Sequence, residues 1–327
     1  MKRTLIFLAA SSLALILVQA GSAETLKVLT YNIGLLKMLG FDLVPVVDAR
    51  AMLAPRELAR FARESSPHLM LLEEVWEESH ADAIVRELSP LGYTATRPKE
   101  RGILGVGSGL LLLTRFPLAV VDWKFTPFTK TTFMDSFVRK GVLEATLEDA
   151  DAGGARFALV GTHAVALDTV NGKPKDQGQL SAFLAQAAQI LSAFNARSAQ
   201  GKMPAMLLGD FNVGPGYVEE AYQKIAGSGS MVEAGARLFP GAPLVTWDPA
   251  NPLVKYGRYP TEPAAKIDHV FLRDGESRGW RALGARIVFD SPVEGLSMQP
   301  SKTAAAVAAP LSDHYGFLVE VELTTRD

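Results

Sequence analysis

The chain has 327 residues, of which 48% are hydrophobic and 21% are charged, and its net charge is −2 at neutral pH. These values are typical of a globular protein with a sizeable core, and a nearly neutral charge disfavours nonspecific tracking of a nucleic-acid backbone. The chain contains no cysteine, which excludes disulfides and thiolate metal sites.

The first 23 residues have the pattern of a signal peptide. Lys2 and Arg3 precede an apolar run over 5–18, and small residues follow at 21–23, where signal peptidase needs them. The alternative is an uncleaved membrane anchor, but the run is shorter than the ~20 residues that span a bilayer. The sequence therefore predicts a signal peptide over 1–23, cleavage near Ala23, a secreted or periplasmic protein, and one domain over 24–327.

Helices and strands alternate in the first third of the remaining chain. A buried strand is predicted over 26–33, followed by an irregular apolar segment over 34–54. Pro55 then opens a helix that ends near Ser66, a buried strand spans 69–72, and a second helix spans 79–88.

The rest of the chain is richer in strands. Short β runs separated by Gly, Pro or charged turns, as in an antiparallel sheet, occupy 93–97, 109–114, 118–125, 138–147 and 157–162. A long amphipathic helix is predicted over 176–198, and further strands over 206–209, 266–272 and 315–323. The pattern predicts an α/β domain in which two mixed sheets pack face to face with helices outside.

Polar side chains stand at the ends of many of these strands. They are Asn32, Glu74, His163, Asp210, Asn212, Asp268, Asp313 and His314. Because strand ends meet at one edge of a sheet, we expect them to converge. Each also has a simpler interpretation: a turn or cap for the Asp and Asn residues, the first turn of a helix for Glu73-Glu74, and a satisfied core or surface position for each histidine.

Three of these residues fit a magnesium site. Glu74 and Asp313 offer hard carboxylate oxygens, and Asn32 adds a neutral oxygen, which is the ligand chemistry that Mg²⁺ prefers.

The other five fit the handling of protons and phosphate. His163 and His314 change charge near neutral pH, so either can move a proton or stabilise a negatively charged phosphorus centre. Asp268 would hold an imidazole in one tautomer, while Asp210 and Asn212 would orient water and a phosphoryl oxygen.

Seven blocks resemble the endonuclease/exonuclease/phosphatase superfamily in their order: TYNI, LLEEVW, GSGLLLLTRFPL, GTH, LLGDFN, KIDHVFL and PLSDH. The resemblance implies a four-layered, DNase-like α/β sandwich with two mixed, mostly antiparallel sheets. It also implies roles: Mg²⁺, for which Mn²⁺ or Co²⁺ can substitute, on Asn32, Glu74 and Asp313, and water attack assisted by Asp210. Transition-state stabilisation would come from Asn212 and His163, and proton transfer from His314 oriented by Asp268.

Further blocks are similar to neutral sphingomyelinases. Besides LLEEVW and the Gly-Ser-Gly-Leu block, residues 135–142 (DSFVRKGV) match an Asp-x-x-x-x-Lys-Gly element of that family, and Thr246-Trp247-Asp248 is similar to bacterial secreted members. The resemblance implies phosphate contacts for Asp135 and Lys140. Two features depart from the family: HAVA over 163–166 replaces the usual His-Thr-Gln-Ala, and no exposed aromatic hairpin is evident over 279–310.

The function implied is that of an exported Mg²⁺-dependent phosphodiesterase that hydrolyses sphingomyelin or a related phospholipid by in-line attack of water. The alternative is a secreted nuclease, or a phosphoinositide or other phosphate-ester phosphatase, on the same scaffold. A non-catalytic binding protein would show a lost ligand, and none is missing. The phospholipid hypothesis predicts transient membrane contact through the apolar segment from Leu35 to Val47, no stable nucleic-acid partner, and a monomer.

Overall fold

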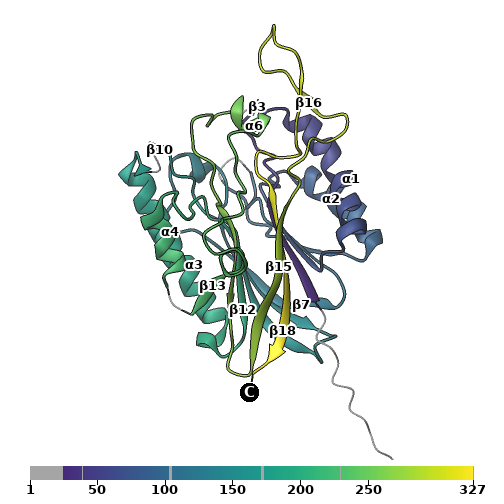
Figure 1. The fold of residues 1–327 in the computed structure, drawn as a ribbon, viewed down its shortest axis with the longest axis vertical. Coiled ribbons are helices and arrows are strands. Elements are labelled where there is room, and N and C mark those ends of the chain that lie inside the picture. The colour runs from purple at the N-terminus through teal and green to yellow at the C-terminus, as the bar shows by residue number, and fades with distance from the viewer. Residues whose placement is uncertain (1–24, 39, 103–104, 171–172, 229, 327) are drawn as a thin grey trace, which may run out of the picture.

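The computed structural model describes residues 25–326 except 39, 103–104, 171–172 and 229. Two six-stranded sheets lie against each other in the middle of the molecule, and helices cover their outer faces (Figure 1). The predicted four-layered α/β sandwich is confirmed. The predicted signal peptide lies outside the described residues, and within them no helix combines the length and apolarity that a membrane span requires.

The first sheet has the strand order β15, β18, β1, β4, β6, β5. Its strands are β1 (Thr25–Asn32), β4 (Leu69–Glu73), β5 (Thr94–Thr96), β6 (Leu111–Thr114), β15 (Arg278–Val288) and β18 (Gly316–Thr325). β1 runs parallel to β4 and antiparallel to β18. The outer face is covered by α1 (Val47–Ser65) and α2 (Glu78–Leu88), with the short turn η1 (Ser89–Leu91) after them.

The second sheet has the order β13, β14, β12, β9, β8, β7. Its strands are β7 (Leu118–Pro127), β8 (Gly141–Asp149), β9 (Ala155–His163), β12 (Ala205–Asp210), β13 (Met231–Glu233) and β14 (Asp268–Arg273). β12 runs parallel to β9 and antiparallel to β14. The helices α3 (Gln177–Arg197) and α4 (Glu219–Ala226) cover the outer face.

Smaller elements connect these layers. They are β2 (Lys37–Met38), β3 (Phe41–Asp42), η2 (Met134–Phe137), β10 (Thr169–Val170), β11 (Lys173–Pro174), η3 (Ala199–Gly201), α5 (Ala234–Leu238), α6 (Pro252–Lys255), β16 (Ser297–Met298) and β17 (Val307–Ala308).

The layering follows from strands that are apolar on both faces. On β1, Val28 lies in the core between the sheets, whereas Leu29 belongs to the core under α1 and α2. On β12, Leu208 faces the core between the sheets and Leu207 faces α3. Strands covered on both faces appear in sequence as continuous apolar runs, which is why these two were predictable.

Gly161 marks a close approach of the two sheets. A Cβ at this position of β9 would lie 2.9 Å from Cδ2 of Leu71 on β4. Gly161→Ala should therefore overpack the core and lower the free energy of unfolding by about 1–3 kcal/mol. Adding Leu71→Val should recover part of that loss, because it shortens the opposing side chain. Urea titrations of both single variants and the double variant measure this, and simple additivity of the two losses would contradict the packing described.

One predicted boundary was wrong, and two of the longer elements were not predicted. α1 begins at Val47 instead of Pro55, which lies inside the helix. The first two turns of α1 bury Val47, Ala51 and Ala54, and that burial outweighs the one hydrogen bond that the proline cannot donate. Strand β15 and helix α4 were not predicted. β15 is an edge strand in which most residues are exposed or half-exposed, so it lacks the apolar run of a central strand.

The segment predicted to touch lipid is only partly exposed. Leu35, Val44 and Val47 are buried, so these three side chains are not on the surface, and membrane contact through the segment stays a prediction. Phe41, in the short β2–β3 pair, is 75% exposed. Leu39 lies outside the described residues.

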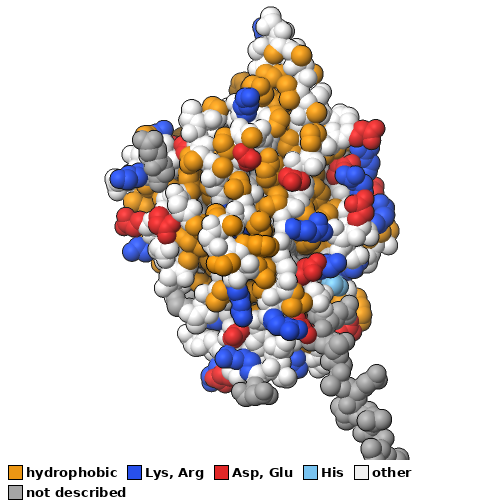
Figure 2. Space-filling view, in the orientation of Figure 1, with side chains coloured by type: hydrophobic (Ala, Val, Ile, Leu, Met, Phe, Trp, Pro, Cys, Tyr) orange, Lys and Arg blue, Asp and Glu red, His pale blue; other side chains and the backbone are white. Residues whose placement is uncertain are grey.

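A second hairpin protrudes from the top of the molecule in Figures 1 and 2. It consists of the paired strands β16 and β17, and Figure 2 shows hydrophobic side chains at its base. Residues 297–308 contain no aromatic side chain. The stretch 279–310 therefore does contain a hairpin, but residues 297–308 of this hairpin are not aromatic.

Candidate active site

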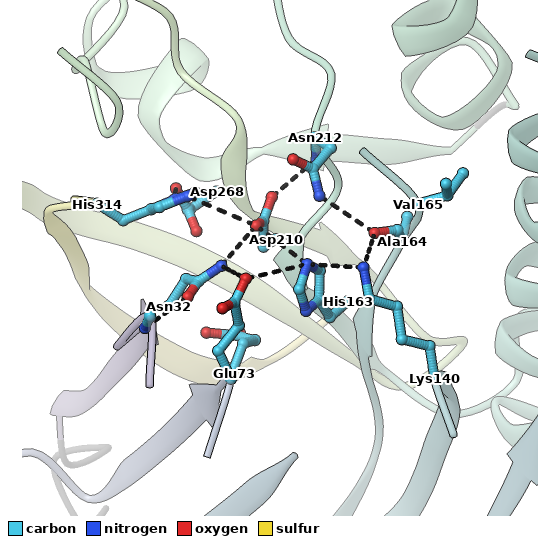
Figure 3. A network of polar contacts seen from close by, with 12 residues as sticks. Asn32, Glu73, Lys140, His163, Ala164, Val165, Asp210, Asn212, Asp268 and His314 are labelled. Carbon is cyan, nitrogen blue, oxygen red and sulfur yellow. Dashed lines mark hydrogen bonds and ion pairs between the residues drawn. The ribbon is translucent and has the colours of Figure 1, made fainter. Parts of the chain in front are cut away.

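The ends of four strands meet at one edge of the two sheets (Figure 3). Asn32 ends β1, His163 ends β9, Asp210 ends β12 and Asp268 begins β14. The register places Asp210 directly beside His163 on one side and Asp268 on the other. Pairing in the sheets thus brings polar residues from distant parts of the sequence into one cluster.

Asp210 lies at the centre of this cluster. Its Oδ2 accepts a hydrogen bond from Asn32 Nδ2 at 2.9 Å and lies 3.5 Å from His163 Nε2 and 3.9 Å from His314 Nε2. Burial and the neighbouring charge of Asp268 raise the pKa of Asp210 to about 7. A carboxylate whose pKa lies near neutrality suits the acceptance of a proton from water.

His314 forms a buried pair with Asp268. Its Nδ1 lies 3.0 Å from Asp268 Oδ2, and the backbone N–H of Asp268 donates to Thr246 Oγ1 at 3.2 Å, which fixes that residue. Burial alone would lower the pKa of His314, but the carboxylates of Asp268 and Asp210 raise it well above its usual value. His314 therefore holds a proton beside Asp210.

His163 has the opposite electrostatic environment. Its Nε2 lies 3.2 Å from Nζ of Lys140, which also donates to Ala164 O at 3.1 Å and lies 3.3 Å from Asp135 Oδ1. Burial, reinforced by the charges of Lys140 and His314, lowers the pKa of His163 well below its usual value. The neutral ring accepts from Lys140, so the two histidines of the cluster differ in charge.

Removal of the lysine charge should be visible at His163. In Lys140→Met we expect the pKa of His163 to rise, because a nearby positive charge is lost, and yet to stay below 6.5, because the ring remains buried. Lys140→Arg keeps the charge and is the matched control. Imidazole ¹⁵N resonances followed against pH measure the shift, and an unchanged His163 titration in Lys140→Met would contradict the assigned contact.

Two hydrogen bonds and two unusual backbone angles hold the loop after β12 next to Asp210. Asn212 has φ 56°, its backbone N–H donates to Asp210 Oδ1 at 2.8 Å, and its Nδ2 donates to Ala164 O at 3.1 Å. Gly209 has φ 138°, and a Cβ there would lie 1.9 Å from Thr162 O. Only glycine allows β12 to lie this close to β9, which explains the glycine of the Gly-Asp-Phe-Asn block.

The opposite side of Asp210 is acidic. Glu74 Oε1 accepts from Asn32 Nδ2 at 3.1 Å, and its Oε2 accepts from Trp76 Nε1 at 3.4 Å. Burial and the charge of Asp313 raise the pKa of Glu74. Asp313 Oδ1 accepts from Ser312 Oγ at 3.2 Å. Two neighbouring carboxylates, together with an amide oxygen, fit a hard divalent cation.

A second group of potential ligands lies nearby. Asp210, Asp268 and His314 each place one ligand atom within 4.8 Å of the others. One of the three candidate ligands in this group is an imidazole nitrogen, whereas Mg²⁺ prefers oxygen ligands. Glu74, Asp313 and Asn32 therefore fit a magnesium ion better.

These residues open into a cavity of about 390 Å³. Most of the predicted site residues line it: Glu74, Asp135, Lys140, His163, Asp210, Asn212, Asp313 and His314. Asn32 and Asp268 contact the lining residues Asp210 and His314. The lining also includes apolar side chains, namely Leu36, Leu43, Val44, Leu167 and Val254. The cavity suits a molecule with both a phosphate and an apolar part.

Three residues of the site were not predicted from the sequence. Trp76 lines the cavity and donates to Glu74, and Ser312 bonds Asp313. Glu73 is buried, accepts from Thr30 Oγ1 at 2.6 Å, and ends β4 instead of opening a helix. Of these three, only Trp76 could have been recognised from the sequence, because it lies two residues after the predicted site residue Glu74.

Three solved structures illustrate the fold that this chain shares. Sphingomyelinase C from Streptomyces griseocarneus has a TM-score of 0.69 and 23% identity, over 91% of this chain and 99% of that chain. A beta toxin mutant from Staphylococcus aureus with bound magnesium ions has a TM-score of 0.68 and 14% identity, over 90% and 99%. TDP2 from D. rerio, complexed with a single-strand DNA product, has a TM-score of 0.64 and 14% identity, over 91% and 99%.

No curated protein matches the chain in sequence. The model of the Endonuclease/Exonuclease/phosphatase family matches residues 29–314, a stretch that runs from before Asn32 to His314. The resemblance inferred from the seven sequence blocks is therefore confirmed, and the chain belongs to the Endonuclease/Exonuclease/phosphatase family.

Proposed function

We propose that this protein is an exported, divalent-metal-dependent phosphodiesterase that hydrolyses sphingomyelin or a related phospholipid. The observation that carries the proposal is the contact of Asp210 with Asn32, His163 and His314 beside a cavity lined by both polar and apolar side chains. A base, two histidines of different charge and an acidic cation site are the parts that phosphodiester hydrolysis needs.

In this proposal Asn32, Glu74 and Asp313 hold Mg²⁺. Bound there, the ion supplies positive charge against a non-bridging phosphoryl oxygen. A magnesium-bound beta toxin of the same fold supports the choice of metal. Mn²⁺ and Co²⁺ are expected to substitute, because all three ligands offer oxygen.

The remaining residues handle water and phosphate. Asp210, with its pKa near neutrality, orients the attacking water and takes its proton. Asn212 and His163 stabilise the charge that builds up on the phosphorus centre, with Lys140 and Asp135 placed beside His163 to contact phosphate. His314, oriented by Asp268, donates its proton to the leaving oxygen as the bond between phosphorus and that oxygen breaks.

The phospholipid assignment has two supports. The likeness to sphingomyelinase C gives a precedent for this substrate on this fold, and the apolar walls of the cavity can accept part of a lipid. Within the segment 35–47, we assign membrane contact to the β2–β3 pair, where Phe41 is 75% exposed. Phe41→Asp should weaken activity on vesicles more than on micelles, and an equal loss on both would contradict this contact.

A nuclease or a phosphatase is the second candidate, since TDP2 with a bound DNA product shares the fold. The net charge of −2 argues against a nuclease, because tight binding to a nucleic-acid backbone normally uses a basic surface. We therefore expect no stable nucleic-acid partner and a monomeric enzyme. Export rests on residues 1–23 and would be checked by the N-terminal sequence of the protein outside the cell.

A substrate panel tests the proposal. The purified protein with Mg²⁺ is offered sphingomyelin, phosphatidylcholine, phosphoinositides and plasmid DNA, each with an EDTA control. We expect fastest turnover of a phospholipid diester and loss of activity with EDTA. Preferred cleavage of DNA or of a phosphate monoester would support the second candidate instead.

A further inference from the structure

Arg50 on α1 is a fully buried charged side chain, with 0% of its surface exposed. Burial of a guanidinium costs free energy unless hydrogen bonds compensate for the lost water. All five hydrogen-bond partners of Arg50 in the structure are backbone carbonyl oxygens, on residues 33, 34, 44, 45 and 311. The side chain thus joins three separate segments of the chain.

The first of these segments follows Asn32. Arg50 Nη1 donates to Ile33 O at 2.9 Å, and Nη2 donates to Gly34 O at 2.6 Å. The side-chain Oδ1 of Asn32 accepts from the backbone N–H of Gly34 at 3.0 Å. The position of Gly34 therefore fixes the orientation of the Asn32 amide.

The second segment precedes Asp313. Arg50 Nη1 donates to Leu311 O at 3.3 Å, and the next residue, Ser312, donates from Oγ to Asn32 O at 2.7 Å. A Cβ on Gly34, which has φ 61°, would lie 2.7 Å from Asp313 Oδ1. The loop after β1 and the loop before β18 are thus packed directly on each other, with Arg50 bonded to both.

The third segment leads into α1. Arg50 Nε donates to Pro45 O at 3.0 Å, and Nη2 lies 3.4 Å from Val44 O. Val44 lines the cavity. The planar fork of an arginine can satisfy carbonyl oxygens in several directions at once, which a lysine ammonium cannot do with the same geometry.

We propose that Arg50 is the positioning residue of the divalent-cation site, because it ties the backbone that carries Asn32 to the backbone that carries Asp313. This inference rests on the proposed assignment of those two residues as cation ligands. Arg50 touches neither the ligand oxygens nor the substrate. It acts by holding two loops in the relative position that one cation requires. The two ligands on these loops, Asn32 and Asp313, are 281 residues apart in the sequence. Residues that orient ligands in this way typically change metal affinity by about 10- to 100-fold when replaced.

A buried arginine elsewhere in the fold provides the matched control. Arg273, at the far end of β14, is 7% exposed, donates to Asn195 Oδ1 at 2.7 Å, and places its guanidinium 4.2 Å from the ring centre of Phe194. It has no contact with the Asn32 or Asp313 loops. Its replacement removes a buried guanidinium without touching the proposed cation site.

The experiment measures cation binding and not turnover. Mg²⁺ and Mn²⁺ are titrated calorimetrically into the purified wild-type protein and into Arg50→Met, Arg50→Lys and Arg273→Met, with folding of each checked by circular dichroism at the same temperature. We expect the Kd for both ions to rise about tenfold or more in Arg50→Met and by less in Arg50→Lys. In Arg273→Met it should stay within about twofold.

Two results would overturn the inference. The first is a folded Arg50→Met protein that binds Mg²⁺ and Mn²⁺ with the wild-type Kd. If Arg50→Met does not fold, a wild-type Kd in Arg50→Lys would have the same meaning. The second is an equal weakening in Arg273→Met, which would show that metal affinity reports general stability. A wild-type protein that binds neither ion would overturn the cation site itself. A protein whose Mg²⁺ affinity depends on Arg50 but which cleaves no phospholipid would overturn only the substrate assignment.

Discussion

Replacement of Asp210 by asparagine is expected to lower turnover by about 10²- to 10⁴-fold. Asparagine has nearly the same shape, but it cannot take a proton from water, and its NH₂ group would face Nδ2 of Asn32, which now donates to the Asp210 carboxylate at 2.9 Å. The measurement is kcat on the preferred substrate of the panel at saturating Mg²⁺. Activity within a few-fold of wild type would contradict the role of Asp210 as base.

The same substitution should not weaken the fold. In the metal-free protein, burial raises the pKa of Asp210 to about 7, so the protonated form is favoured in the folded state and stability is lost as the pH rises from the unfolded pKa near 4 to 7. Asp210→Asn avoids that loss, which offsets the cost of its NH₂ group facing a hydrogen-bond donor, so its free energy of unfolding at pH 8 with EDTA should be close to the wild-type value.

Asp149 supplies a control for this experiment. It is buried at the end of β8 and accepts from the backbone N–H groups of Asp151 and Ala152. Asp149→Asn should therefore leave kcat unchanged. A comparable loss of activity in both variants would show that the effect of Asp210→Asn is not specific to the site.

Glu74→Gln is expected to weaken Mg²⁺ binding by about 10²-fold or more, because an amide cannot supply the negative charge that a hard divalent ion needs from its ligands. It should also remove most activity at millimolar Mg²⁺, with partial recovery as the Mg²⁺ concentration rises. The remaining carbonyl oxygen can still accept one of the two hydrogen bonds, from Asn32 or from Trp76, so the variant should fold.

Glu144→Gln is the matched control for Glu74. Glu144 is buried on β8, where its Oε1 lies 3.1 Å from Lys124 Nζ, and it is not among the residues that line the cavity. Its replacement should leave the Kd for Mg²⁺ unchanged. Equal Mg²⁺ affinity in Glu74→Gln and wild type would contradict the assignment of Glu74 as a ligand.

The central strands and the polar residues at their ends could be predicted because both depend on local sequence. β1 and β12 are apolar on both faces and therefore stand out as continuous runs. The Gly-Asp-Phe-Asn block marks the point where β12 ends, and the structure places Asp210 and Asn212 there.

Features that depend on distant contacts could not be predicted in this way. α1 begins eight residues before Pro55 because its first turns are buried against the core. The bond between Lys140 and His163 joins neighbouring strands, and nothing in either local sequence reveals that His163 loses its proton while His314 keeps one. Arg50 is buried because it donates to carbonyl oxygens in three segments of the chain. The sequence around Arg50 contains no sign of these distant partners.

Hydrolysis of sphingomyelin in H₂¹⁸O, with Mg²⁺ present and with EDTA in a parallel sample, tests the central claim most directly. In-line attack of water on phosphorus predicts one ¹⁸O atom in the phosphorylated head group, none in the released lipid, and no product with EDTA. Label in the lipid product, or equal turnover with EDTA, would contradict a metal-dependent phosphodiesterase built around Asp210.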